Sequence, residues 1–341
     1  MPATHCPVLD DFSVLMKQST PVMRLRGFDV GESVVYVGLA CLNPSGSVKD
    51  VMAWHMLRKA RERGAIKSGD TILEVTTGNT GIAFAMLSAL CGYKFVAVMP
   101  EHMSVERRQI MRAYGADVVL TPKEEDIPGA LRRYRELAEE LAPNVWLPDQ
   151  FANEDNVEAH YLTTGENLAR SLPERIDVFV AGVGTGGTFL GVSRRLREFW
   201  PECLGVVVEP AESAVLSGGE ANLHGIQGIG EGFVPDLIKN NRDEIGEVAV
   251  VSTAEAEETA RTLALKSGFF AGVSSGANIA AAVRYAKARP GCRVVTLIPD
   301  RGERYLNQGL FCCRPEDCAC SRHRSVGGLF PNDSNPEECE Q

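Results

Sequence analysis

The chain has 341 residues, of which 44% are hydrophobic and 23% charged, values typical of a globular protein with a full core. Its net charge of −10, with no compensating basic block, argues against nucleic acid as the main partner. No apolar run reaches the ~18 residues of a membrane span, and the N-terminus lacks the features of a signal peptide. We therefore expect a cytoplasmic protein that binds neither nucleic acid nor membranes.

Short β-branched runs alternate with helical patterns over most of the chain. The runs are nearly continuous in apolar residues, which indicates strands buried on both faces, as in parallel sheets. The predicted strands are 34–39, 71–75, 95–99, 117–120, 178–181, 205–209, 248–251 and 293–298. The predicted helices include 48–63, 82–91, 105–114, 130–141 and 254–266. This alternation predicts an α/β fold with helices on both sides of the sheet.

Soft boundaries fall near 143–150 and after Phe311, where the periodicity stops. In open α/β sheets, ligands bind at the carboxyl ends of strands, where loops lead into helix N-termini. The four glycine-containing loops in such positions are therefore the first places to look for chemistry.

The first loop, NPSGSVKD (43–50), predicts a helix start with Ser47 as the N-cap and Lys49 in the first turn. A nucleotide P-loop is disfavoured because Asp50, rather than serine or threonine, follows the lysine. The motif alone leaves two interpretations open. Lys49 is either a solvated charge or an amine that bonds to a carbonyl, with a pKa lowered by the positive helix end.

The next two loops suit anions. VTTGNTG (75–81) offers hydroxyls, an amide and backbone N–H groups that fit a carboxylate, although a structural turn would use similar residues. GVGTGGT (182–188) combines four glycines with Thr185 and Thr188, which favours a phosphate monoester. It also resembles GxGxxG, and Glu209 at the end of the next predicted strand keeps a dinucleotide site open.

The fourth loop, GVSSG (272–276), is a hydroxyl-lined helix start that also fits the GxSxG pattern of hydrolases through Ser274. No histidine stands in a convincing partner position, which disfavours hydrolysis. The histidines show no paired ligand spacing either, so no metal is expected in the core.

An amine, a phosphate cradle, an anion-binding turn and a serine together match the needs of pyridoxal 5′-phosphate (PLP). Its aldehyde requires the amine, its phosphate the cradle, and its 3′-oxygen and ring nitrogen require polar partners. A neutral serine opposite the ring nitrogen would leave that nitrogen unprotonated, which favours β-elimination and replacement over transamination.

Taken together, the loops resemble those of the fold-type II PLP enzymes, in particular the cysteine synthase and cystathionine β-synthase family. The match runs from about Ser19 to Phe311 and includes NPSGSVKD, TTGNTGIAFA, MPEHMSVERRQIMRAYGA, QFANEDN, GVGTGGT, QGIGEGF, GVSSGAN and PDRGERYL. The resemblance implies a homodimer of a tryptophan synthase β-like fold, with two open twisted, mostly parallel sheets flanked by helices. It also implies a smaller mobile domain, 48–150, and a larger phosphate-binding domain, 1–47 plus 151–311.

The resemblance further implies a role for each site residue. Lys49 would form the Schiff base with the PLP aldehyde and shuttle the substrate Cα proton. Asn79 would bond to the 3′-oxygen, and Ser274 would face the ring nitrogen. The phosphate would be held by Gly184, Thr185, Gly186, Gly187 and Thr188. The substrate would be bound by Thr76, Thr77, Gly78, Thr80 and Gln150, with Gly228 beside its amine.

The implied reaction is β-replacement on an activated L-serine, O-acetylserine or O-phosphoserine, through an aminoacrylate intermediate. Sulfide is the expected nucleophile, with L-cysteine as the product. The alternatives are an amine or another thiol as nucleophile, as in diaminopropionate-precursor or cystathionine synthases, and a catalytically silent PLP-binding regulator.

Two charged residues depart from the family pattern. Glu231 stands where a small residue or a tyrosine is common, and it is either solvated or selects an amine-bearing co-substrate. Arg301 replaces a common serine, and it either meets an anionic substrate group or pairs with an acid. Relatives that make diaminopropionate precursors can carry such an arginine.

The ten cysteines fall into two groups of five. Those in the body of the chain stand singly and are expected to be buried core thiols. The segment 312–341 is expected to be flexible, and its soft-ligand cluster could bind a thiophilic metal, be redox-active or be a disordered thiol-rich tail. The cluster comprises Cys312, Cys313, Cys318, Cys320 and His323.

Overall fold

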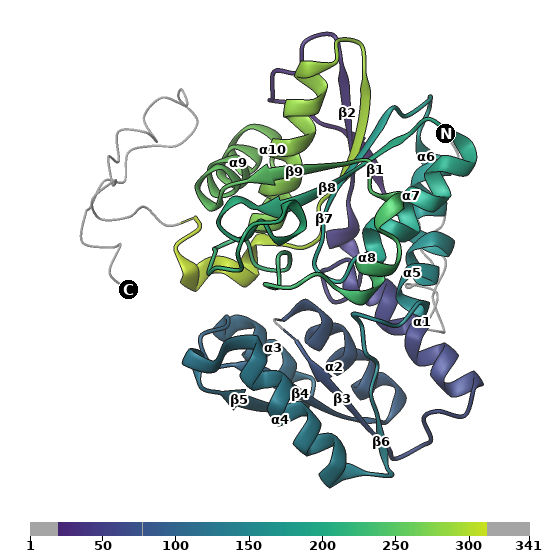
Figure 1. Cartoon of the computed structure of the whole chain (residues 1–341), viewed down its shortest axis with the longest axis vertical. Coiled ribbons are helices and arrows are strands. Elements are labelled where there is room, and N and C mark those ends of the chain that lie inside the picture. The colour runs from purple at the N-terminus through teal and green to yellow at the C-terminus, as the bar shows by residue number, and fades with distance from the viewer. Residues whose placement is uncertain (1–19, 77, 312–341) are drawn as a thin grey trace, which may run out of the picture.

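The computed structural model describes residues 20–76 and 78–311, so Thr77 and the cysteine-rich segment 312–341 lie outside the described residues. The described chain forms two sheets, each flanked by helices, which lie one above the other in Figure 1. This arrangement confirms the predicted α/β class with two mostly parallel sheets.

The smaller sheet is four-stranded and parallel, in the order β5–β4–β3–β6. Its strands are β3 (Thr71–Val75), β4 (Lys94–Pro100), β5 (Asp117–Thr121) and β6 (Val145–Trp146). Every residue of β3 is buried, because helices cover both faces of the sheet. One face packs on α1 (Lys49–Glu62), α2 (Asn79–Cys91) and α3 (Val105–Ala113), and the other on α4 (Asp126–Leu141).

The larger sheet has six strands in the order β1–β2–β10–β7–β8–β9. The strands are β1 (Val22–Arg24), β2 (Val34–Gly38), β7 (Val178–Gly182), β8 (Leu204–Pro210), β9 (Glu247–Val251) and β10 (Arg293–Leu297). Only the pairing of β1 with β2 is antiparallel. The central strands β10, β7 and β8 are almost completely buried, as expected for strands that helices cover on both faces.

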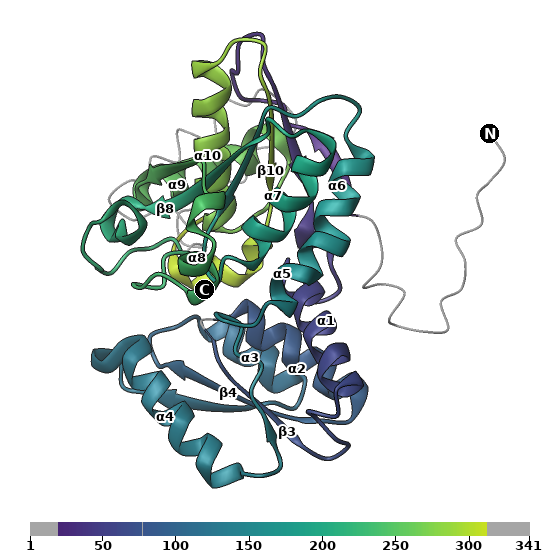
Figure 2. The ribbon, with the colours of Figure 1, turned by 45° about the vertical axis from the view of Figure 1, so that its right-hand side comes forward.

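Helices also cover both faces of the larger sheet. On one face lie α9 (Thr253–Ser267) and α10 (Val273–Ala288). On the other lie α6 (Glu166–Ser171), α7 (Gly187–Phe199) and α8 (Asp236–Asn240), with α5 (Asp155–His160) joined to α6 by a π-helical turn, Tyr161–Gly165. In Figures 1 and 2, α1 and α5 run side by side where the layers of the two sheets meet.

The structure differs from the sequence prediction mainly in its short elements. The strands β1 and β6 were not predicted, because three and two residues are too few for a periodic pattern. The helix α4 begins four residues earlier than predicted, with Pro128 in its first turn, where proline is tolerated. The helix α1 begins at Lys49 with Val48 at its N-cap instead of the predicted Ser47, although Ser47 Oγ still accepts the Lys49 backbone N–H at 3.3 Å. Within the described ranges, no helix combines the length and apolar character needed to cross a membrane.

Candidate active site

A cavity lies at the carboxyl ends of β3 and β7 and is lined by residues that follow strands of both sheets. It brings together most of the predicted site residues, which come from distant parts of the sequence. Those that line it are Lys49, Thr76, Asn79, Thr80, Gln150, Gly184, Thr185, Gly186, Thr188, Gly228 and Ser274. Gly78 and Gly187 are not lining residues, but each stands at the start of a helix that borders the cavity.

Lys49 is the first residue of α1, and its side chain lines the cavity. Burial lowers the pKa of its amine, while the carboxylates of Glu231 and Glu74 act more weakly in the opposite direction. The lowered pKa increases the fraction of neutral, nucleophilic amine near pH 7. The direction agrees with the prediction, but its main cause is desolvation rather than the helix end.

The turn before α2 is built on internal hydrogen bonds. Thr76 Oγ1 accepts the backbone N–H groups of Gly78 at 3.0 Å and Gly81 at 3.1 Å. Gly78 has a φ of 150°, and a Cβ there would lie 2.1 Å from Arg107 Cδ, so only glycine fits. The turn therefore stands at the N-terminus of a helix that carries no acidic residue in its first turn, a position that favours a negatively charged group.

Thr80 and Gln150 form a second part of the same wall. The Thr80 hydroxyl donates to Gln150 Oε1 at 2.6 Å, and Gln150 Nε2 donates to the Val75 carbonyl at 3.0 Å. These bonds fix the Gln150 amide against the end of β3. The pair therefore presents fixed polar groups beside the turn.

Asn79 is the first residue of α2, and its amide faces both the cavity and the larger sheet. Its Nδ2 donates to Asp300 Oδ2 at 2.7 Å. Its Oδ1 is buried and has no hydrogen-bond partner within the described part of the chain. A buried amide oxygen without a partner is unusual and is typical of a site that a polar ligand completes.

The GVGTGGT loop forms a tight cradle at the N-terminus of α7. Gly186 has a φ of +94°, and a Cβ at Gly184 would lie 2.5 Å from the Gly228 carbonyl oxygen. Behind the loop, Asn156 Nδ2 donates to Thr185 Oγ1 at 3.0 Å and to the Gln150 carbonyl at 2.8 Å. Backbone N–H groups, a helix N-terminus and two hydroxyls suit a phosphate group.

His160 supports the cradle from behind. Its ring lies 3.0 Å from Thr164 Oγ1 through Nδ1 and 3.1 Å from Thr188 Oγ1 through Nε2. Burial lowers the pKa of His160 to about 3, so the ring is neutral. The histidine therefore orients the Thr188 hydroxyl without adding a charge next to the cradle.

Ser274 stands in the first turn of α10 and is 4% exposed. It is one of the residues that line the cavity. The hydrolase alternative finds no support around it, because His55, His160 and His224 bond to Glu158, to two threonines and to the Gly230 carbonyl, respectively.

Glu209 and Arg301 do not have the roles that the sequence suggested for them. Glu209, the acid of the dinucleotide alternative, accepts the backbone N–H groups of Leu216 and Ser217 at 2.8 and 3.0 Å, so it caps a turn. Arg301 does not line the cavity, and its Nε donates to the Cys41 carbonyl at 2.9 Å. Glu231, by contrast, does line the cavity.

Sequence reasoning missed several residues that shape the site. Arg107 lines the cavity, Asn156 links the two halves of its wall, and Asp300 holds Asn79. Arg107 stands in the motif MPEHMSVERRQIMRAYGA and Asp300 in PDRGERYL. Asp300 follows the strand β10, so the rule that ligands gather at strand carboxyl ends could have selected it.

The residues present fit PLP. The cavity combines an amine of lowered pKa, a glycine cradle that a Cβ would fill, and a buried amide oxygen without a partner in the described chain. The amine and the cradle match the aldehyde and the phosphate of the cofactor, and the amide of Asn79 offers a polar partner for a ring substituent.

Comparisons with known proteins agree with this geometry. The model of the pyridoxal-phosphate dependent enzyme family matches residues 15–300. A cysteine synthase of Staphylococcus aureus (strain Mu50 / ATCC 700699) is 46% identical over 295 residues, covering 86% of this chain and 94% of that protein. The chain belongs to the pyridoxal-phosphate dependent enzyme family.

Solved structures give the same result for the fold. The cysteine synthase of Entamoeba histolytica superposes with a TM-score of 0.85 at 34% identity, covering 92% of this chain and 94% of that one. An O-ureido-L-serine synthase superposes with a TM-score of 0.86 at 39% identity, covering 94% and 100%. The predicted family, fold and cofactor are therefore confirmed, and the chain is a PLP-dependent enzyme of the cysteine synthase type.

Proposed function

We propose that this enzyme catalyses β-replacement on an O-activated L-serine, with sulfide as the nucleophile and L-cysteine as the product. The observation that carries this proposal is the cavity that joins Lys49, the turn before α2 and the glycine cradle, in a chain 46% identical to a cysteine synthase. Bound PLP would supply a carbonyl for the amino group of the substrate and an electron sink for its Cα.

The residue roles of this proposal are those that the family resemblance implies. Lys49 Nζ would hold the cofactor carbonyl carbon and later take and return the substrate Cα proton. Its lowered pKa supports both roles, because a neutral amine can bond to a carbonyl and accept a proton. Gly184, Thr185, Gly186, Gly187 and Thr188 would hold the phosphate, Asn79 the 3′-oxygen and Ser274 the ring nitrogen.

We assign the substrate carboxylate to the turn before α2. The positive end of this helix and the hydroxyls of Thr76 and Thr77 would bind it, with Gly78, Thr80 and Gln150 fixing the shape of the wall. Gly228, which lines the cavity with a φ of +93°, would lie beside the substrate amine.

The segment 48–150 holds all four strands of the smaller sheet, and we propose that it moves as a domain against 1–47 plus 151–311. Binding of the substrate carboxylate to the turn before α2 would draw the two parts together. Closure would exclude water from the reacting Cβ, which protects the reactive intermediate from hydrolysis.

The alternatives have less support. The diaminopropionate-precursor reading depended on Arg301 reaching an anionic substrate group, and the guanidinium of Arg301 instead bonds to the Cys41 carbonyl, outside the cavity wall. A silent PLP-binding regulator is less well supported, because the relatives named above are enzymes.

The direct test is a two-stage assay of the PLP-loaded enzyme. O-acetylserine, O-phosphoserine, serine and cysteine are titrated separately while the visible spectrum is followed, and sulfide, glutamate, homocysteine or hydroxyurea is then added. We expect O-acetylserine or O-phosphoserine to change the spectrum and sulfide to restore it, with L-cysteine in the products. Restoration by another nucleophile but not by sulfide would refute the cysteine synthase assignment.

Two further proposals come from the family resemblance. We propose that the enzyme is a homodimer and that it works in the cytoplasm. Size-exclusion chromatography with light scattering gives the first answer, with a mass of twice the chain expected, and fractionation of the source cells gives the second.

A further inference from the structure

Asp300 lies where three of the loops around the cavity meet. Its backbone forms a bridge with Ser47, in the loop that leads to the cavity lysine. Its carbonyl accepts the backbone N–H of Gly272, the residue before α10, at 3.2 Å. Its side chain is fully buried, at 0% exposure, and bonds to Asn79. One residue therefore contacts the segments that carry the lysine, the serine and the asparagine of the site.

The side chain of Asp300 is an acceptor for groups on both sides of the cavity. Its Oδ2 accepts Asn79 Nδ2 and the Tyr305 hydroxyl, each at 2.7 Å, and lies 3.8 Å from Arg107 Nη2. Asn79 and Arg107 belong to helices of the smaller sheet, whereas Asp300 and Tyr305 follow the last strand of the larger sheet. The carboxylate therefore ties the two halves of the structure together directly beside the cavity.

An ionised carboxylate can only accept hydrogen bonds, whereas an asparagine amide can present either a donor or an acceptor. The bond to Asp300 therefore fixes the orientation of the Asn79 amide, because Nδ2 rather than Oδ1 must face the carboxylate. Nδ2 carries two hydrogens, and Asp300 takes only one of them. The second hydrogen is left for a ligand, and a ligand oxygen that accepts it would share a donor polarised by the carboxylate.

We propose that Asp300 is a positioning residue for the cofactor, which acts by fixing the Asn79 amide so that an N–H, and not a carbonyl, faces the PLP 3′-oxygen. The proposal rests on PLP binding in this cavity, but it does not depend on which serine ester or nucleophile the enzyme uses. It also explains why a fully buried carboxylate occupies a loop whose backbone alone already bonds to Ser47 and Gly272.

The test is a double-mutant cycle between Asp300→Ala and Asn79→Ala, read by PLP affinity. Apo-protein is titrated with PLP by cofactor fluorescence, and the pH titration of the visible absorption band of bound PLP is recorded for each variant. Asp300→Asn is the conservative variant, since its Oδ1 can occupy the place of Oδ2 and accept both donors. Tyr305→Phe is the control for packing, because it removes the other donor to the same oxygen and leaves the Asn79 bond.

We expect Asp300→Ala to weaken PLP binding about tenfold, because it removes a charge-assisted hydrogen bond. It should also shift the pH titration of the absorption band in the same direction as Asn79→Ala does. In the Asn79→Ala background, Asp300→Ala should change PLP affinity by less than about twofold. Asp300→Asn should restore most of the affinity, and Tyr305→Phe should leave the absorption band unchanged. If Asp300→Ala does not fold, Asp300→Ser replaces it, because its shorter hydroxyl cannot reach Asn79.

Three results would overturn the proposal. They are additive effects of the Asp300 and Asn79 variants, an Asp300→Asn variant as weak as Asp300→Ala, and a Tyr305→Phe variant that moves the absorption band equally. Each would mean that Asp300 acts through general packing. Because these measurements use PLP alone, they stay separate from the assay with serine esters and sulfide, whose failure would instead count against the proposed reaction.

Discussion

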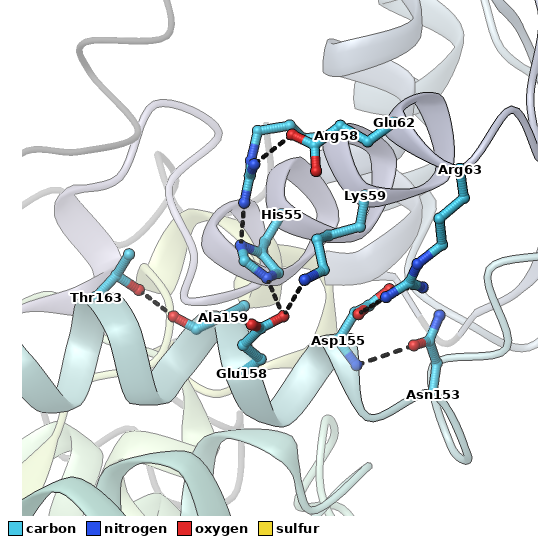
Figure 3. Close-up of polar contacts among 10 residues, drawn as sticks. All are labelled: His55, Arg58, Lys59, Glu62, Arg63, Asn153, Asp155, Glu158, Ala159 and Thr163. Carbon is cyan, nitrogen blue, oxygen red and sulfur yellow. Dashed lines mark hydrogen bonds and ion pairs between the residues drawn. The ribbon is translucent and has the colours of Figure 1, made fainter.

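The two ends of α1 both carry charged residues, and these residues have different surroundings. At the N-terminal end, Lys49 lies in the cavity with a pKa lowered by burial. At the other end, Figure 3 shows cationic side chains of α1 facing the carboxylates of α5. There, Glu158 Oε2 lies 2.9 Å from both His55 Nε2 and Lys59 Nζ, and Arg63 forms two bonds to Asp155 at 2.7 and 2.8 Å.

The difference lies in how completely each set of polar groups is satisfied. The ligand atoms of His55, Asp155 and Glu158 lie within 4.8 Å of one another, a spacing that a metal ion could use. However, Lys59 already pairs with Glu158 and Arg63 with Asp155, so this cluster holds α1 against α5. The cavity instead keeps a buried amide oxygen of Asn79 that has no partner within the described residues. The Asn79 oxygen without a partner, together with the cavity that it lines, distinguishes this site from the paired charges at the other end of α1.

The sharpest test of this comparison uses two lysines of the same helix. Lys49→Ala should lower kcat by about 1,000-fold or more, because it removes the amine that holds the cofactor and moves the proton. Lys59→Ala, ten residues along, should change kcat by less than about twofold, because it removes only a partly exposed ion pair. Steady-state assays of both variants decide the matter, and equal losses would contradict the distinction between the two ends.

A second test concerns the cradle. Gly187→Ala would place a Cβ 2.0 Å from Asn156 Oδ1, pushing Asn156 away from Thr185 and Gln150. We expect PLP affinity to fall about 10-fold to 100-fold, as for a strained packing defect of about 1–3 kcal/mol.

The control for the cradle is Ser193→Ala in the same helix. Its buried hydroxyl has no hydrogen-bond partner in the described structure, so its removal should leave PLP affinity unchanged. Fluorescence titration measures both variants. A Gly187→Ala variant that binds PLP like the wild type would exclude this loop as the phosphate site.

A third test uses Glu74, a buried acid in β3 whose Oε2 has no partner in the described chain. Burial, together with nearby Asp149, raises its pKa from 4.5 to about 8. Folding thus favours the protonated form, so its contribution is complete below about pH 4.5 and is lost as the pH rises through about 8. Glu74→Gln should remove that loss and stabilise the protein at pH 8.5 by roughly 1–4 kcal/mol relative to the wild type.

Thermal unfolding across this pH range, with the exposed Glu202→Gln as control, measures the effect of Glu74. Parallel pH profiles for the wild type and Glu74→Gln would show that the carboxyl of Glu74 does not titrate in this window.

The smallest effect is expected at the satisfied end of α1. His55 and Lys59 lower the pKa of Glu158, so its contribution to stability is present above about pH 4.5 and is lost as the pH falls through the lowered pKa. Its side chain is 41% exposed, and solvent screening limits the contribution to at most about 1 kcal/mol. Glu158→Gln should therefore lower the melting temperature slightly at pH 7 and leave kcat unchanged, as differential scanning calorimetry and activity assays would show.

The sequence was sufficient for the parts of the molecule that local patterns determine. The strands longer than four residues were predicted from their apolar runs, which are most continuous where helices bury both faces of the strand. The glycine cradle was predicted because its backbone conformation requires particular residue types. The partner of Asn79 was not predicted, because Asp300 lies 221 residues away and only the folded chain brings them together. Arg301, the neighbour of Asp300, attracted attention by its charge, and it bonds outside the cavity.

Whether Lys49 is the residue that binds the cofactor can be measured directly. The PLP-loaded protein is treated with borohydride, digested and mapped by mass spectrometry. We predict that the reduced cofactor is attached to the peptide that contains Lys49, and that no label appears in the Lys49→Ala variant. Attachment to any other lysine in an active preparation would contradict the account.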